Sequence, residues 1–318
     1  MTATELPVAR RATGTRRPLR MSKREFREAL QGYAFATPWI LGLIFFTVGP
    51  ILASMYLSFT QYNVLKPPQW VGLDNYVYAF TKDQQFWPSL ARTFRYAVMV
   101  VPLSIVGSFF LAMLLNQDLK GTAVYRTLFF LPHLTPVAAM AILWKWLLQA
   151  EIGPVNYLLG LIGIQGPAWL SSQQWALPSL AMISVWAAVG GNEMLIFLAG
   201  LQGVPKELYE AAELDGAGRL ARVRHVTLPM VSPSIFFNLV LALIGALKVF
   251  SLAFVGTAGG PGYATWFYAL HIYRSAFENF EMGYASALAW VLAVILFGFT
   301  YIQVSGSSRW VYYEGEAA

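Results

Sequence analysis

Residues 204–233 read Val-Pro-Lys-Glu-Leu-Tyr-Glu-Ala-Ala-Glu-Leu-Asp-Gly-Ala-Gly-Arg-Leu-Ala-Arg-Val-Arg-His-Val-Thr-Leu-Pro-Met-Val-Ser-Pro, a polar island between two long apolar segments. Pro205 suits the first turn of a helix, where a missing N–H is tolerated, and Gly216 suits a helix stop. The stretch therefore predicts a short helix over about residues 206–215. A turn follows it, and the chain re-enters an apolar span near Leu228-Pro229. So polar a loop must lie outside the lipid.

The composition is that of a membrane protein. Of the 318 residues, 57% are hydrophobic and 12% are charged, whereas a soluble domain averages about 25% charged residues. The apolar residues also form runs long enough to span a bilayer as helices. The sequence therefore predicts an all-α integral membrane protein with six transmembrane helices. They cover approximately residues 33–59, 91–116, 123–148, 175–200, 232–255 and 283–304.

The distribution of Lys and Arg predicts the orientation in the membrane. If the N-terminus is inside, the inner segments hold fifteen Lys and Arg and the outer segments five. Basic residues favour the cytoplasmic side, so both termini are predicted to be cytoplasmic, in the plasma or inner membrane. The predicted parts are a basic arm (1–32), a transmembrane domain (33–304) and a tail (305–318). The same distribution accounts for the net charge of +6 without a nucleic-acid partner.

Several kinds of chemistry are not predicted. The chain has no cysteine and three widely separated histidines, so we expect no metal site. It contains no Gly-x-x-x-x-Gly-Lys-Ser/Thr, no Gly-x-Ser-x-Gly and no His-Glu-x-x-His, so we expect no enzyme activity and no cofactor in this chain. A secondary active transporter remains an alternative, although more spans would be typical of one. A scaffold without a solute path is another, but it leaves the charged residues of the spans unexplained.

Glu193 and Lys248 are ionisable residues predicted to lie within spans, where such residues usually have a function. Counting about 1.5 Å per residue from the span ends places them at similar depths. We expect them to face a shared polar cavity and to form an ion pair, with Asn192 and Ser251 as neutral neighbours and Phe250 as a stacking face for a sugar ring. A substrate contact and a structural pair between the fourth and fifth spans both remain open.

The polar island resembles the cytoplasmic Glu-Ala-Ala loop of permease subunits from binding-protein-dependent ABC importers. Its matching positions are Glu210, Ala211, Ala212, Gly216, Val226, Leu228 and Pro229, with every spacing kept. Other segments are similar to carbohydrate-uptake permeases of the maltose or glycerol 3-phosphate type. They include residues 70–76, 126–132, 153–157, 197–202 and 259–261. Ala258 and Ser251 depart from the usual residues of that family, which weakens any transfer of substrate identity.

The resemblance implies a six-helix half-transporter and its partners. Those partners are a second permease, expected to be a different chain, two cytoplasmic ABC ATPases that bind ATP and Mg, and an extracytoplasmic solute-binding protein. The substrate implied is an oligosaccharide, sugar or polyol, with glycerol 3-phosphate included. The loop helix would transmit ATPase movement to the spans. Its implied coupling residues are Glu210, Ala211, Ala212, Asp215, Gly216, Leu228 and Pro229.

Overall fold

The computed structural model describes residues 23–117 and 120–312. Most of the predicted basic arm and the end of the predicted tail lie outside the described residues. The chain divides into two units, Met1–Ala53 and Ser54–Ala318. The first holds α1 (Lys23–Leu43), the π-helical turn η1 (Ile44–Val48) and the start of α2 (Gly49–Ser58). Helix α1 crosses residue 32 without a break, so no change in structure marks the predicted end of the arm.

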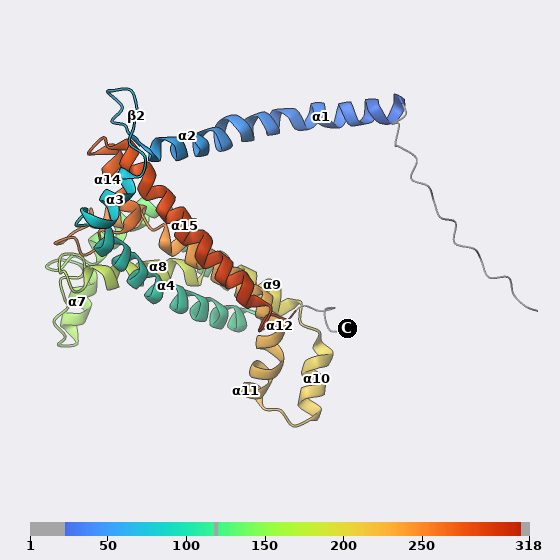
Figure 1. Ribbon diagram of the computed structural model, residues 1–318. Coiled ribbons are helices and arrows are strands. Elements are labelled where there is room, and N and C mark those ends of the chain that lie inside the picture. The colour runs from blue at the N-terminus through green and yellow to red at the C-terminus, as the bar shows by residue number, and fades with distance from the viewer. Residues whose placement is uncertain (1–22, 118–119, 313–318) are drawn as a thin grey trace, which may run out of the picture. The chain divides into compact units, whose positions relative to one another are not determined.

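The second unit is a helical bundle with one short pair of antiparallel strands (Figure 1). The strands are β1 (Thr60–Gln61) and β2 (Gln69–Trp70). The helices before the polar island are α3 (Asp74–Thr81), α4 (Phe86–Leu115), α5 (Thr122–Phe130), η2 (Leu131–Leu134), α6 (Val137–Leu147), α7 (Pro154–Leu161), α8 (Ala176–Val189) and α9 (Asn192–Gln202). The rest are α10 (Lys206–Leu214), α11 (Arg219–Arg222), η3 (Val223–Thr227), α12 (Leu228–Leu247), α13 (Ser251–Gly256), α14 (Tyr268–Phe277) and α15 (Met282–Ser307).

Helix α4 is the centre of the bundle and packs against α8, α9 and α12. One face of α4 carries the buried side chains Tyr96, Val100 and Leu111. The same face buries the hydroxyls of Ser104 and Ser108. Most other long side chains of the bundle are aliphatic or aromatic. Burying a polar side chain requires a hydrogen-bond partner, so the two serines mark a place where the bundle holds polar groups.

Five helices of the described residues are long and apolar enough to cross a membrane, and a bent helix pair makes six if it is counted as one span. That pair, Thr122–Leu134 and Val137–Leu147, bends by 94° in the region of the third predicted span. The bend follows from Pro136, which has no N–H to donate and disfavours a helical Thr135. Thr135 is extended, with φ −73° and ψ 128°. The span predicted over residues 123–148 is therefore broken at Pro136 into two helices.

The fifth predicted span also has different limits. A helical run begins at Arg219, passes through η3 and ends at Leu247. Lys248 is the C-terminal cap of α12, and its N–H donates to the carbonyls of Ile244 and Gly245. The negative end of the helix dipole favours a cation at this position. The predicted span is therefore not one continuous helix: it is interrupted after Leu247, α13 follows, and Lys248 lies at a helix end.

The segments that connect the long apolar helices gather at two opposite ends of the bundle (Figure 1). Helices α10 and α11 project together as a hairpin at one end. Helices α3 and α14 and the strand pair lie at the other. Because the long apolar helices connect these ends, the arrangement is that of a protein with two faces toward water and a lipid-facing belt between them.

A buried polar cluster at the α3 and α14 end joins three segments. The carboxylate of Asp83 accepts a hydrogen bond from Nε2 of His271 at 2.6 Å and another from the hydroxyl of Tyr284. Its other oxygen accepts from the N–H of Gln85 at 2.7 Å. Burial raises the pKa of Asp83, but these hydrogen bonds and the charge of His271 together lower it below its ordinary value. The cluster thus ties the turn before α4 to α14 and α15.

Candidate functional site

The fourth span breaks at Gly190–Gly191, between α8 and α9. A side chain at Gly190 would collide with the carbonyl oxygen of Phe129, so glycine is what lets the end of α5 approach this break. Helix α9 then begins with Asn192 and Glu193. The positive end of the helix dipole favours the Glu193 carboxylate in the first turn. The break therefore delivers two polar side chains to the middle of the bundle.

The carboxylate of Glu193 is held by two serines of α4. Ser104 Oγ lies 3.4 Å from Oε1, with the Val101 carbonyl as an alternative acceptor at 3.2 Å. Ser108 Oγ lies 3.2 Å from Oε2, with the Ala188 carbonyl as its alternative at 3.4 Å. The serines are four residues apart, which places them on the same face of α4. This pair of hydroxyls partly replaces the water that a buried carboxylate loses.

A cavity of about 340 Å³ opens beside this carboxylate. It lies between α4, α8, α9 and α12, and His133 of η2 completes its wall. Its aliphatic lining comes from residues such as Val100, Ile196 and Leu241. Its polar lining consists of Tyr96, Ser104, His133, Ser184, Asn192, Glu193 and Asn238. Hydroxyls, amides, an imidazole and a carboxylate in an apolar cavity can bind a small ligand rich in hydrogen-bonding groups.

Asn238 is the most buried of the polar side chains on this wall, with 0% exposure. Its Nδ2 donates to the backbone carbonyl of Glu193 at 3.1 Å. That carbonyl can only accept, so it fixes which end of the amide is the donor. Among the described residues no donor reaches Oδ1 of Asn238. A buried acceptor without a partner is uncommon and costs about 1–3 kcal/mol, so this atom requires an explanation.

The structure brings together only some of the residues that the sequence predicts around one polar cavity, which we call the predicted substrate path. Asn192 and Glu193 line the cavity, whereas Lys248, Phe250 and Ser251 do not. Phe250 instead packs on Phe254 and Tyr273, with ring centroids 5.3 and 4.9 Å away.

The predicted ion pair between Glu193 and Lys248 is absent from the salt bridges of the described residues. The prediction was wrong for two reasons. Helix α12 ends at Leu247, which leaves Lys248 exposed, and the Glu193 carboxylate is within hydrogen-bond distance of two serine hydroxyls instead.

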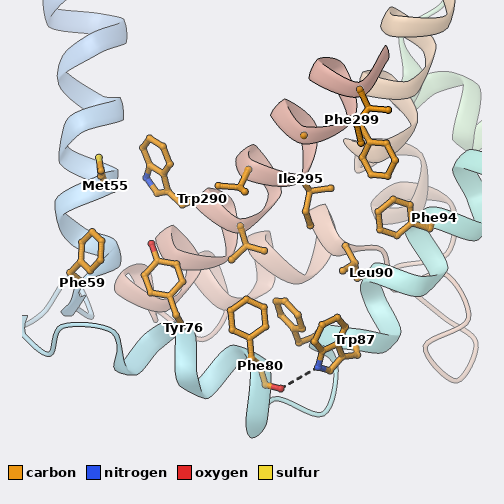
Figure 2. Close-up of a pocket in the computed structure, with 15 residues that line it drawn as sticks. Met55, Phe59, Tyr76, Phe80, Trp87, Leu90, Phe94, Trp290, Ile295 and Phe299 are labelled. Atoms are coloured by element: carbon orange, nitrogen blue, oxygen red, sulfur yellow. Dashed lines mark hydrogen bonds between the residues drawn. The ribbon is translucent and has the colours of Figure 1, made fainter. Parts of the chain in front are cut away.

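A second cavity, of about 710 Å³, has a different character (Figure 2). It lies where α3 and the first turns of α4 meet α15, with Met55 and Phe59 at one side. Its lining is aliphatic and aromatic, and no charged residue contributes to it. Trp87 Nε1 is already bonded to the Phe80 carbonyl, at 3.1 Å. A polar ligand would find few hydrogen-bond partners there, so the smaller cavity beside Glu193 is the candidate solute site.

The α10–α11 hairpin is the second functional feature, and the predicted helix at residues 206–215 is confirmed as α10 (Lys206–Leu214). Gly216 has φ +80°, the left-handed region. The N–H of Gly216 donates to the Glu213 carbonyl at 3.0 Å, and the N–H of Ala217 donates to the Ala212 carbonyl at 2.9 Å. These two bonds form a Schellman motif, which requires a left-handed residue just past the helix end.

The hairpin is braced at its base and open at its tip. Tyr209 Oη and Thr227 Oγ1 lie 3.1 Å apart, and Arg222 pairs with Glu213 at 3.4 Å. Glu210, Ala211, Asp215 and Gly216 are exposed, and Ala212 is half-buried. Leu228 and Pro229 form the first turn of α12 and are exposed. Leu214 and Leu220 are 90% and 82% exposed at the tip.

Sequence reasoning missed several of these residues. Ser104, Ser108 and Asn238 were not singled out, since isolated polar residues within apolar spans are common. The four-residue spacing of the serines was the signal that could have found them. His133 of η2 also lines the cavity. Leu214 and Leu220 were overlooked because apolar residues near a helix end usually pack inward.

Comparison with known proteins agrees with this architecture. Residues 104–305 match the family model described as binding-protein-dependent transport system inner membrane component. The chain is 44% identical to the probable ABC transporter permease protein YesP of Bacillus subtilis (strain 168), over 91% of this chain and 94% of that protein.

Two further similarities concern named transport systems. The trehalose/maltose transport system permease protein MalF of Thermococcus litoralis is 31% identical, over 89% of this chain and 95% of that protein. A crystal structure of a bacterial ABC transporter that imports the acidic polysaccharide alginate contains a chain of the same fold. Its TM-score is 0.80 at 24% identity, covering 90% of this chain and 98% of that chain.

The family model covers well over half of the chain, and the similarity to these relatives extends over nearly all of it. Relatives of this kind are transport subunits whose ATPases are separate chains, so the chain is not an enzyme. The chain therefore belongs to the family of binding-protein-dependent transport system inner membrane components, as a multi-pass permease subunit of an ABC importer.

Proposed function

We propose that this chain is a six-span permease subunit that moves a carbohydrate into the cytoplasm, powered by ATP hydrolysis on partner chains. Its bent third span, Thr122–Leu134 with Val137–Leu147, would count as one crossing. Both termini would be cytoplasmic, with a basic arm at residues 1–32, a transmembrane domain at 33–304 and a tail at 305–318. The α10–α11 hairpin would then also be cytoplasmic.

The observation that carries this proposal is the connection between the hairpin and the cavity. Helix α9 begins at the cavity with Asn192 and Glu193 and ends just before α10. After α10 and α11 the chain continues through η3 into α12, which returns to the cavity with Asn238. Both helices that leave the hairpin thus line the cavity. A partner that displaces the hairpin would move the two cavity walls with it.

The surface of the hairpin supports a role in docking. Ala211 and Ala212 keep one side of α10 thin, while Leu214 and Leu220 offer apolar side chains at the tip. Exposed apolar groups beside charged ones are typical of protein contacts. We propose that α10 couples the permease to a cytoplasmic ATPase, with Glu210 as a polar contact and Gly216 as the turn. Asp215 would fix the end of α10, and Leu228 and Pro229 would fix the start of α12, so that the hairpin moves as a rigid lever.

We propose the remaining partners by analogy with the family. A second permease, two ATPases and an extracytoplasmic solute-binding protein would complete the importer, and ATP and Mg would bind to the ATPases. The carbohydrate class is supported by the name of the Thermococcus relative and by the hydroxyl, amide and carboxylate lining of the cavity. Of the five residues that the sequence predicts around a polar cavity, Asn192 and Glu193 are the proposed solute contacts. Lys248, Phe250 and Ser251 are not proposed as contacts of this cavity.

The test begins with purification of the chain from its native membrane in mild detergent, followed by identification of the proteins that accompany it. We expect a P-loop ATPase and a second permease. The complex would then be reconstituted in proteoliposomes with its binding protein, and uptake of labelled sugars would be measured with and without ATP. Recovery of the chain alone, with uptake that survives ATP depletion, would replace the proposal with a secondary transporter.

A further inference from the structure

We infer that the cavity beside Glu193 selects neutral, hydroxyl-rich sugars and excludes anionic ones, and that Asn238 and Glu193 determine this selectivity. The inference rests on the proposed function and defines the substrate class of the same site. It follows from two independent features of the wall, its charge and its unpartnered acceptor.

The first feature is the charge of the wall. Among the described residues that line the cavity there is no Lys or Arg. Glu193 is the acid on the wall, and His133 is the base. A phosphate or carboxylate on a ligand would therefore lose its water without gaining a compensating cation.

Protonation of Glu193 does not reverse this argument. A carboxylate would repel an anionic ligand directly. A protonated carboxyl would remove the repulsion but would still supply no positive charge. Lys248, the cation once expected to share this site, is exposed at the end of α12 and does not line the cavity.

The second feature is a buried hydrogen-bond acceptor that has no donor among the described residues. Asn238 Oδ1 has no donor among the described residues, although the side chain is fully buried. Two serine hydroxyls lie 3.4 and 3.2 Å from the Glu193 carboxylate, and a carboxylate has capacity for more than two donors. Tyr96 and Ser184 are already paired with each other at 2.5 Å. Asn238 Oδ1 and the Glu193 carboxylate can therefore accept further hydrogen bonds, which sugar hydroxyls would supply.

A ligand can reach Asn238 only if α9 and α12 move apart, because these helices pack together at the cavity and the side chain is fully buried. In this conformation the amide lies beneath the wall, joined to the backbone of Glu193 at 3.1 Å. A ligand hydroxyl that reached Oδ1 would satisfy the acceptor. A ligand without a donor at that point would leave it unpaired, which is the basis of strong discrimination in hydrogen-bonding sites.

The test uses the permease assembled with its partner permease and ATPases in lipid nanodiscs, without the binding protein, so that the permease alone selects the ligand. Glucose and glucuronate form a matched pair that differs in charge at one carbon, and maltose and glycerol 3-phosphate extend the series. Affinities would be measured by ligand-observed saturation-transfer NMR. We expect glucuronate to bind at least about 100-fold more weakly than glucose.

Variants test each feature. Asn238→Leu removes the acceptor at similar size and should weaken glucose binding about tenfold. The combination Glu193→Gln and Asn192→Lys places a cation on the wall and should admit glucuronate. Asn279→Leu, in the exposed turn before α15, is the matched control and should change neither affinity. Partner recovery and thermal melting of each variant would show that the complex is assembled.

The outcomes separate this inference from the proposed function. Equal or tighter binding of glucuronate to the wild-type complex would overturn the charge selectivity but leave a carbohydrate importer. Unchanged glucose affinity in an assembled Asn238→Leu complex would remove Asn238 from the selectivity. If no sugar of either charge binds and none is taken up with ATP, the carbohydrate function fails as well.

Discussion

Substitution of Gly216 tests whether the α10 turn carries the coupling. Gly216 has φ +80°, and a Cβ built on it would have no neighbour within 4 Å. Any effect of a side chain there would therefore come from backbone conformation and not from a clash. The left-handed region costs an L-residue roughly 1–2 kcal/mol, least for Asn and most for β-branched residues.

The expected magnitudes follow from that cost. Gly216→Ala should disfavour the observed turn by about 1 kcal/mol once the lower entropy of its unfolded chain is included. Gly216→Val should cost about 2 kcal/mol, and Gly216→Asn should cost less than Ala. A difference of 1–2 kcal/mol changes the population of the ordered turn roughly 5- to 30-fold. Gly218 is the matched control, because its φ is −68° and a Cβ there would also meet nothing within 4 Å.

The assay is ATP-driven uptake by the complete importer in proteoliposomes, with ATPase activity and partner recovery measured on the same samples. We expect uptake per ATP to fall in the order wild type and Gly218→Ala, Gly216→Asn, Gly216→Ala, Gly216→Val. Membrane insertion should be unchanged, because the turn is exposed. Normal coupling in Gly216→Val, or an equal loss in Gly218→Ala, would refute the idea that the left-handed turn positions the lever.

Two further substitutions test the packing at the opposite end of the bundle. Asp83→Ala leaves the hydrogen-bond donors of His271 and Tyr284 without their acceptor, so it should cost roughly 1–3 kcal/mol and lower the Tm in detergent, whereas exposed Glu151→Ala should not. The folded-state pKa of Asp83 is lowered, so its contribution is full above the ordinary value of about 4 and is lost as the pH falls through the folded-state value. The Tm difference from wild type should therefore shrink below about pH 4, and a difference that widens there would contradict this account. Gly283→Ala would push a Cβ against the backbone oxygen of Thr60 and should cost about 1–3 kcal/mol, whereas Gly298→Ala on the same helix meets nothing within 4 Å and should be neutral or slightly stabilising. Equal melting temperatures for the two glycine variants would show that the backbone at Thr60 moves to accommodate the added Cβ of Gly283→Ala.

The loop helix was predictable because its signals are local. Pro205 starts α10 and Gly216 ends it, and both act through the backbone geometry of one or two residues. The bend at Pro136 was equally local, but the apolar run continues on both sides of it. Hydropathy alone therefore concealed a break that the proline chemistry predicts.

The polar site was less predictable because depth along a span depends on where the helix ends. A one-dimensional count placed Glu193 and Lys248 at similar depths. That count assumed that α12 continues past Lys248, whereas the helix ends at Leu247. Which serines and amides face the carboxylate depends on the packing of α4, α9 and α12. Contacts between residues more than forty positions apart produce no recognisable pattern in the local sequence.

The hydrogen bonds of the site also connect the cavity to the hairpin. Glu193 lies in the first turn of α9, two serines of α4 hold its carboxylate, and Asn238 of α12 holds its backbone carbonyl. Three helices are thus tied to one residue. Two of them, α9 and α12, lead directly into the α10–α11 hairpin. Because the same two helices line the cavity and carry the hairpin, any rocking that the hairpin transmits must change the hydrogen bonds around Glu193. Solute binding and ATPase docking would then act on the same continuous segment, α9 through the hairpin to α12. No other chain of contacts through the bundle would be needed to couple them.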